Sequence, residues 1–305
     1  MDRTARLAWT SIGWTVATVL LGALVRATHS GAGCGRSWPT CQGQVLPELA
    51  GATSIEFTHR VASGIALVLV AVLVAVVWRR RPRGHPSRRA AAWAGIAIVA
   101  EALIGAAIVF YEWVADDTSV ARAVSVPIHL ANTLLLLGAL TLTAWFLSGG
   151  GELDRRGPAR RWLLLGATAL VGIAATGAVT ALADTLFPAT GVATESAEHF
   201  LTRLRIVHPI LAVTAVIAGL MAARRLQSRI PGPVTPLVIL VVAQVGLGVA
   251  NIRFGTPLWL QLLHLAVADV IWISYVWLAA QVLSNNSSNS SAVATGVRHT
   301  NPLHK

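Results

Sequence analysis

A glutamate, a histidine and an arginine stand just before a long apolar stretch. Glu56, His59 and Arg60 lie three and four positions apart, and the stretch from Val61 to Trp78 carries no charge. Residues three and four apart share one face of a helix, so the carboxylate, imidazole and guanidinium would project together. Ionisable groups at membrane depth are costly and by default mark a functional site. We expect Glu56 to accept a proton or stabilise charge; the alternative is that it only pairs with Arg60.

Three further histidines recur at comparable places along the chain. His129 and His264 open apolar segments within the similar sequences Ile-His-Leu-Ala and Leu-His-Leu-Ala, and His208, like His59, precedes an apolar run that ends in an arginine pair. Two imidazoles from facing helices of a bundle suit bis-histidine haem ligation, whereas zinc needs more ligands than each pair offers. For each imidazole, the alternative is a plain hydrogen bond between helices. The remaining histidines are expected to be surface groups: His29, His85, His199, His299 and His304.

The composition of the chain shows what must position these side chains. Of 305 residues, 55% are hydrophobic and 12% are charged, with a mean hydropathy of +0.65, whereas a soluble domain carries about 25% charged residues. We therefore predict an integral membrane protein in contact with the lipid bilayer. Eight apolar runs have the roughly 20-residue length that spans a bilayer: 7–27, 56–78, 90–110, 125–147, 162–183, 203–223, 234–252 and 258–283.

Basic residues set the expected orientation of these spans. Arginines precede the first span and crowd the loops after the second, fourth and sixth, which makes that side cytoplasmic by the positive-inside rule. Both termini would then be cytoplasmic, in the plasma membrane, and the four histidines would lie near the outer face. This distribution accounts for the net charge of +11 without a nucleic-acid partner. The polar segment 284–305 is expected to be a disordered cytoplasmic tail.

Short sequence matches recur in the same order in the two halves of the chain. Glu101-Ala-Leu-Ile-Gly105 corresponds to Gln244-Val-Gly-Leu-Gly248, and Gly22-Ala-Leu-Val to Gly177-Ala-Val-Thr. An even number of helices per half makes such a repeat parallel, whereas an inverted-repeat transporter needs an odd number. We predict an all-α membrane protein of eight transmembrane helices, arranged as two pseudo-symmetric parallel four-helix bundles: 1–150 and 151–283.

The two halves differ beside their first histidines. Glu56 stands three residues before His59, whereas Arg205 stands three residues before His208. This asymmetry suggests that the first half carries out a reaction and that the second relays electrons. The sequence leaves open the roles of two other charged residues within apolar runs: Glu101 and Asp269.

Two cysteines lie in the first outer loop. Cys34 and Cys41 belong to the segment Gly33-Cys-Gly-Arg-Ser-Trp-Pro-Thr-Cys41, and on the oxidising side of a membrane they fit a disulfide. Glycine and proline let the loop turn back on itself, and the chain then leads towards Glu56, so the loop could cover the first-half site. It would serve either as a structural staple or in a redox role.

The segment from Gly22 to Cys41, together with Glu56-Phe-Thr-His-Arg-Val-Ala-Ser-Gly64, resembles the haem A synthase family, and the resemblance extends over 7–283. It implies an oxidoreductase that converts the C8 methyl of haem O into the formyl group of haem A for terminal oxidases, with oxygen taken from water. It also implies a role for each candidate residue: haem b on His208 and His264, the substrate haem near His59 and His129, catalysis by Glu56, and a Cys34–Cys41 disulfide.

The same resemblance suggests partners, and alternatives remain open. A haem O synthase and an electron acceptor are implied partners, while homo-oligomer formation is left open. Four arginines near the outer face are candidates for pairing with haem propionates: Arg26, Arg60, Arg205 and Arg253. The chain departs from the family where His29 replaces a glycine and Glu101 a glutamine. The competing class is a non-catalytic dihaem b-type electron carrier, which explains four histidines but neither the single Glu56 nor the cysteine loop.

Overall fold

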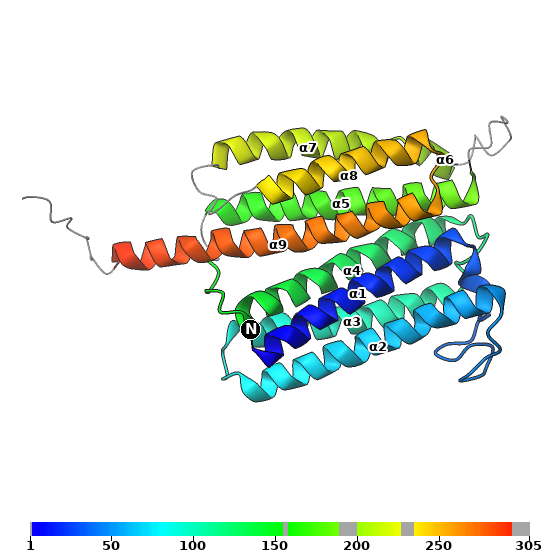
Figure 1. The fold of residues 1–305 in the computed structure, drawn as a ribbon, viewed down its shortest axis with the longest axis horizontal. Coiled ribbons are helices and arrows are strands. Elements are labelled where there is room, and N and C mark those ends of the chain that lie inside the picture. The colour runs from blue at the N-terminus through cyan, green and yellow to red at the C-terminus, as the bar shows by residue number, and fades with distance from the viewer. Residues whose placement is uncertain (1, 155–157, 189–199, 227–234, 295–305) are drawn as a thin grey trace, which may run out of the picture.

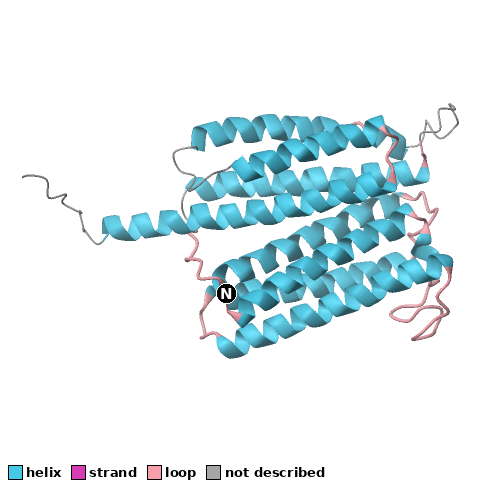
Figure 2. Cartoon of the chain, in the orientation of Figure 1, coloured by secondary structure: helices cyan, strands magenta, loops and turns pink. Residues whose placement is uncertain are grey.

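The fold is described by a computed structural model covering residues 2–154, 158–188, 200–226 and 235–294. Within these ranges the regular structure is entirely helical, without strands (Figure 2). Eight helical segments are long and apolar enough to cross a membrane, as the hydropathy pattern predicts. The helices are α1 (Arg3–Ala27), η1 (Ser30–Ala32), α2 (Gly51–Arg80), α3 (Pro86–Phe110), α4 (Val120–Leu147), α5 (Pro158–Leu186), α6 (Phe200–Leu204), α7 (Val207–Leu226), α8 (Thr235–Arg253) and α9 (Leu258–Ala294).

Two of these elements differ from the spans expected at 203–223 and 258–283. The first is split into α6 and α7 by a turn at Arg205 and Ile206, because Pro209 has no N–H for the carbonyl of Arg205 and its ring crowds that carbonyl. The second continues as helix to Ala294, since no glycine or proline interrupts the chain before Gly296. The part of the expected disordered tail up to 294 is therefore helical, and 295–305 lies outside the described residues.

The helices form two adjacent groups, α1–α4 and α5–α9, with their long axes roughly aligned (Figure 1). Successive long helices run in alternating directions, so the loop 28–50 and the starts of α2, α4 and α9 lie together at one end, here called the cysteine-loop end. The N-terminus lies at the opposite end. α1 and α4 of the first group pack against α5 and α9 of the second, so these four helices form the seam.

Large aromatic side chains hold this seam together. Trp272 of α9 donates its indole N–H to the carbonyl oxygen of Leu134 in α4 at 2.7 Å. Trp277 of α9 packs against Trp9 in a tilted arrangement and against Trp145 edge to face, with ring centroids 5.6 and 5.0 Å apart. Such pairs add about 0.5–1.5 kcal/mol each beyond simple burial, so the two groups are joined as one packed unit.

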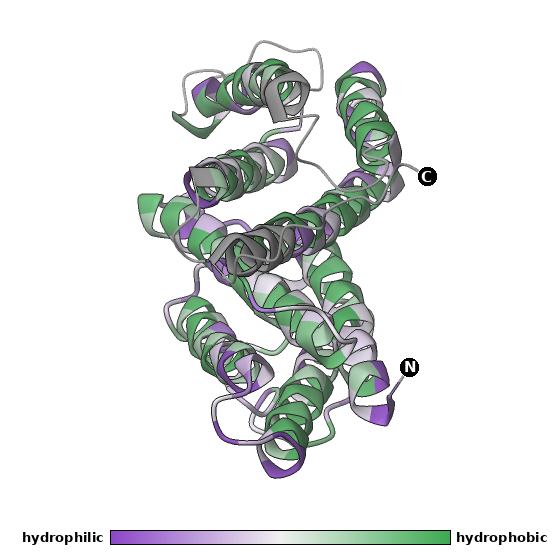
Figure 3. Ribbon diagram, turned by 90° about the vertical axis from the view of Figure 1, so that its left-hand side faces the viewer, coloured by the Kyte–Doolittle hydropathy of each residue, from purple (hydrophilic) through white to green (hydrophobic). Residues whose placement is uncertain are grey.

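Apolar residues surround most of the helices, while hydrophilic ones gather at helix ends and loops (Figure 3). Outward-facing side chains such as Val68, Trp93, Leu103 and Val242 are all more than half exposed. Helices that are hydrophobic all round require either burial or a lipid environment. The exposed apolar surface is therefore the surface that a bilayer would cover.

Candidate functional site

The four predicted histidines lie at similar depths near the cysteine-loop end. His59, His129 and His264 fall within the first three turns of α2, α4 and α9, and His208 is the second residue of α7. All four line one continuous cavity of about 1810 Å³ that reaches into both groups of helices. A pocket for a single small molecule usually measures about 300–1,000 Å³. The cavity is therefore large enough for more than one bulky ligand.

Two of these imidazoles rest on glycines of the neighbouring helix. A Cβ atom added to Gly22 of α1 would lie 3.0 Å from Cε1 of His59, and one added to Gly177 of α5 would lie 3.0 Å from Cε1 of His208. A larger residue at either position would push the ring out of place. These are the glycines that begin the two matching segments of the sequence, and the contacts give a physical reason for the match.

The other two imidazoles also face glycines, but their polar neighbours differ. Cβ atoms on Gly105 and Gly248 would lie 3.8 and 3.4 Å from Cε1 of His129 and His264, respectively. Nδ1 of His129 lies 3.3 Å from a carboxylate oxygen of Glu101, whereas Nε2 of His264 lies 3.1 Å from the amide nitrogen of Gln244. The sites therefore share their shape and differ in charge.

Glu101 is held on its other side by two residues of α4. Asn132 donates its amide N–H to one carboxylate oxygen at 2.5 Å, and the Thr133 hydroxyl donates to the other. Both follow His129 within four positions, so one helical turn places the imidazole and the two donors around the same carboxylate. No partner for Glu101 could be identified from the sequence, because this contact joins helices that pack only in the folded protein.

His208 and His264 face each other across the second part of the cavity. Their ring centroids are 6.4 Å apart and their planes are nearly perpendicular, at 86°. Two imidazoles on opposite sides of one metal, each with a metal–nitrogen bond of about 2 Å, have ring centres on the order of 6 Å apart. The backbone carbonyl of Ile173 lies 3.1 Å from Nδ1 of His208, which would leave Nε2 free for a ligand.

Orphaned polar atoms support a ligand in this cavity. Nδ1 of His59 and Nδ1 of His264 are buried with no hydrogen-bond partner among the described residues, and so is one carboxylate oxygen of Asp269. An unpaired buried polar atom costs about 1–3 kcal/mol. Within the described part of the chain, no group of three or more His, Cys, Asp or Glu side chains could hold a metal ion by itself. The donor set thus suits a metal that brings most of its own ligands.

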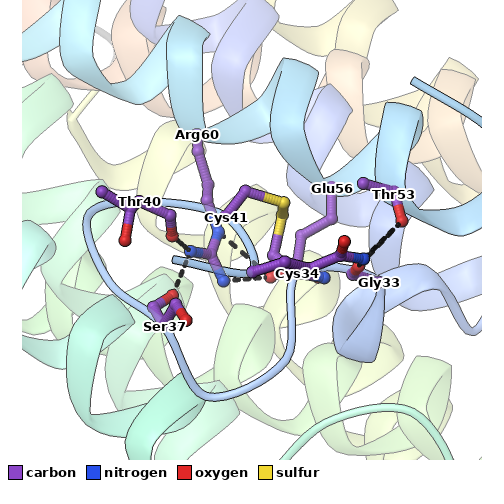
Figure 4. A network of polar contacts seen from close by, with 9 residues as sticks. Gly33, Cys34, Ser37, Thr40, Cys41, Thr53, Glu56 and Arg60 are labelled. Atoms are coloured by element: carbon purple, nitrogen blue, oxygen red, sulfur yellow. Dashed lines mark hydrogen bonds and ion pairs between the residues drawn. A yellow bond between two sulfur atoms is a disulfide. The ribbon is translucent and has the colours of Figure 1, made fainter. Parts of the chain in front are cut away.

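Glu56 lies buried at the rim of the same cavity, 3% exposed, and both its oxygens are engaged (Figure 4). Arg60 donates to one oxygen from Nη2 at 2.5 Å and from Nε at 3.1 Å, and the backbone N–H of Cys34 donates to the other at 2.7 Å. Arg60 also donates from Nη1 to the carbonyl oxygens of Ser37 and Thr40. The Glu56–Arg60 salt bridge, which is the alternative role considered for Glu56, is thus present. Both of its side chains also form hydrogen bonds with the backbone of the cysteine loop.

The cysteine loop is closed by a Cys34–Cys41 disulfide and pinned to the start of α2. Thr53 and Gln42 both donate to the carbonyl oxygen of Gly33, at 2.8 and 2.9 Å. Position 33 has no room for a side chain, because a Cβ atom added to Gly33 would lie 2.5 Å from the backbone of Ala52. Farther along the loop, Trp38 and Pro39 line the cavity. The loop therefore forms part of the cavity wall beside Glu56.

Replacing both cysteines with serine should loosen this loop. Removing a covalent closure of this length costs on the order of 2–3 kcal/mol in loop entropy, and Arg36 already lies exposed within it. We expect trypsin to cleave after Arg36 several-fold faster in the double variant, as measured by mass spectrometry of timed digests. Cleavage at Arg83, in the loop between α2 and α3, is the internal control and should not change. Equal cleavage at Arg36 in both proteins would contradict a stabilising role for the disulfide.

Two of the histidines predicted to be surface groups have structural partners. Nδ1 of His29 lies 2.7 Å from a carboxylate oxygen of Asp116, in an exposed pair. His85 caps α3, since its Nδ1 accepts the backbone N–H of Ser87. Neither belongs to the cavity lining. The remaining three lie outside the described residues: His199, His299 and His304.

Comparison with known proteins gives a family match along most of the chain. The model of the COX15-CtaA family, described as a cytochrome oxidase assembly protein, matches residues 5–54 and 46–276. A protoheme IX farnesyltransferase of Thermus thermophilus is 44% identical over 300 residues, covering 94% of this chain and 49% of that protein. Heme A synthases of Lysinibacillus sphaericus and Geobacillus thermodenitrificans are 35% and 36% identical over 162 and 140 residues, covering 51% and 45% of this chain and 48% and 42% of theirs. The chain spans about half the length of the curated relatives it matches.

Proposed function

Because this chain belongs to the haem A synthase family of COX15-CtaA cytochrome oxidase assembly proteins, we propose that it oxidises the C8 methyl of haem O to the formyl group of haem A. The observation that carries this proposal is that an acid precedes only one of the two corresponding histidines, His59 and His208. Glu56 is buried beside the His59 site and lines the cavity, whereas the matching position before His208 is Arg205. A carrier with two equivalent haems has no use for such an acid.

We propose that the two groups of helices are pseudo-symmetric halves, 1–150 and 151–283, each built around one pair of histidines. Support comes from the paired contacts of His59 with Gly22 and of His208 with Gly177, which have the same closest approach. The first half would receive haem O between His59 and His129. The second would hold haem b between His208 and His264. Haem b, when bound, supplies one-electron transfer away from the first half.

The reaction needs a proton acceptor in the first half. Conversion of the methyl to a hydroxymethyl group consumes one water and releases two protons and two electrons, and oxidation to the formyl group releases two more of each. Glu56 would take up a proton from the attacking water or stabilise positive charge on the substrate. Arg60 and the Cys34 N–H hold the carboxylate in place for this. Arg60 would act by positioning Glu56, because its donors are directed to the carboxylate and to loop carbonyls.

The electrons must leave to an acceptor outside the chain. We propose that the arginine-rich loops and both termini are cytoplasmic, in the plasma membrane, so that the cysteine-loop end faces outward. Support comes from the three connections that join α2 to α3, α4 to α5 and α7 to α8. Together with the helix ends beside them, they contain 13 of the 24 basic residues. In this orientation the haem sites lie near the outer face.

The Thermus relative suggests a partner. That protein is about twice as long as the part that aligns, and we propose that its prenyl-transfer activity resides in the part outside the alignment. A haem O synthase beside this chain would supply its substrate directly.

Extraction of the haems from the purified protein tests the proposed function. The protein would be made in cells that also produce haem O, and the haems separated by chromatography. We expect haem B together with haem A or a hydroxylated haem O. Haem B alone, at two per chain, would instead support the dihaem b-type electron carrier.

A further inference from the structure

We propose that Arg26 and Arg205, with Arg122 behind them, form a carboxylate-binding seat at the cysteine-loop end of the cavity, and that this seat takes the propionates of the haem held by the second half. The inference rests on the proposed function, because it needs a haem at His208 and His264. It concerns a different feature of the site: the charged groups that would fix which way the macrocycle points.

The seat lies where the two halves meet. Arg26 is in the last turn of α1, and its guanidinium crosses to the second half, where it donates to the carbonyl oxygen of Ala181, to the hydroxyl of Thr185 and, at 2.9 Å, to the side-chain oxygen of Gln261. Arg205 places Nε 2.9 Å from a carboxylate oxygen of Asp184. All of the side chains that define the seat line the same cavity: Arg26, Arg122, Asp184, Arg205 and Gln261.

The seat lies at the depth expected for the edge of a macrocycle held by His208 and His264. Arg205 stands three residues before His208, and Gln261, which Arg26 contacts, stands three residues before His264. Three helical residues advance about 4.5 Å along the axis. In α9, Gln261 therefore lies nearly one turn closer to the cysteine-loop end than His264, and Arg205 lies in the turn immediately before α7.

The charge of the seat is incompletely balanced. Arg26 and Arg205 share Asp184 as their acidic neighbour, so one positive charge is left over. Arg122 is 3% exposed, its charge acts on Arg26, and its Nε has no hydrogen-bond partner among the described residues; the acids that act on it, Asp116 and Asp117, belong to the loop before α4. An uncompensated charge buried at membrane depth is costly. A carboxylate entering the cavity would remove that cost.

The ordinary alternative is that both arginines only cap α5. Arg205 donates from Nη2 to the carbonyl oxygens of Ala183 and Phe187, and Arg26 to that of Ala181, near the C-terminal end of α5, where a cation is favourable. One cation suffices for a cap, and neither capping bond accounts for the buried Nε of Arg122. The planar guanidinium is also the group best suited to bind a carboxylate through two hydrogen bonds.

The test compares binding of haemin with binding of haemin dimethyl ester, which lacks the carboxylates. The whole 305-residue chain is made in haem-depleted cells and titrated in detergent, and binding is followed by the Soret band. We expect wild type to prefer haemin about tenfold to a hundredfold, as charge-assisted hydrogen bonds imply, and Arg26→Gln and Arg205→Gln to reduce that preference to within about threefold. Arg36→Gln, which alters an exposed arginine at the same end, is the matched control and should keep the wild-type ratio.

Asp184→Asn tests the proposal in the opposite direction, and also serves if the arginine variants fail to accumulate. Removing the shared counter-ion should raise the preference for haemin above that of wild type. Equal binding of haemin and its ester by wild type would overturn the seat and leave the proposed function standing. Binding of neither compound by wild type would overturn both.

Discussion

A Glu56→Gln variant should keep its bound haem and lose at least about a hundredfold in haem A formation. The amide has the size of the carboxylate and retains one acceptor for the Cys34 N–H or for Arg60, so the fold of the cysteine loop should survive. It cannot take up a proton, and losing a positioned proton acceptor costs roughly 10²–10⁴-fold in rate. The measurement is the ratio of haem A to haem O extracted from membranes that contain equal amounts of each protein.

Glu48→Gln provides the matched control for this variant. Glu48 precedes α2 in the same loop region but is exposed and outside the cavity lining, so its replacement should leave haem A formation unchanged. Full activity in Glu56→Gln would refute the catalytic role and reduce Glu56 to a partner of Arg60. Loss of activity together with loss of haem would point instead to a structural role.

Much of the fold could be predicted because a bilayer imposes simple rules. Among the described residues, the eight apolar runs correspond to eight helical segments that are long and apolar enough to cross a membrane, since every backbone polar group in lipid must be satisfied within its own helix. Local chemistry at helix ends was harder to read. The break before α7 depends on Pro209, and the extension of α9 to Ala294 depends on the absence of a helix breaker rather than on hydropathy.

The candidate site was only partly visible in the sequence. The histidines could be selected by their recurrence, and Glu56 by its spacing from His59. The contacts of Glu101 with His129, and of Arg26 with Gln261, join residues 28 and 235 positions apart. Only tertiary packing brings them together. Arg122 and Asp184 could not be singled out from the sequence for the same reason, because only the folded structure shows that both line the cavity.

Substitutions of the histidines should also distinguish the roles of the two halves. His264→Ala or His208→Ala should remove the haem b spectrum almost completely, because each removes one of the two imidazoles that face each other at 6.4 Å. The loss of affinity should exceed the roughly 10–100-fold that follows loss of an outer-shell partner. His129→Ala should instead retain haem b and lose haem A formation. His29→Ala, in an exposed pair with Asp116, is the control and should change neither property.

Reduced-minus-oxidised spectra of the four purified variants, with haem content normalised to protein, show which half holds haem b. If His129→Ala lost haem b while His264→Ala retained it, the assignment of cofactor and substrate sites would have to be exchanged, and Glu56 would then stand beside the cofactor. If all three cavity variants lost half of two equivalent haems, the electron carrier would be the better description. Loss of haem b confined to the His208 and His264 variants would assign the electron relay to the half in which Arg205 stands at the position of Glu56, which leaves the half with Glu56 for the oxidation.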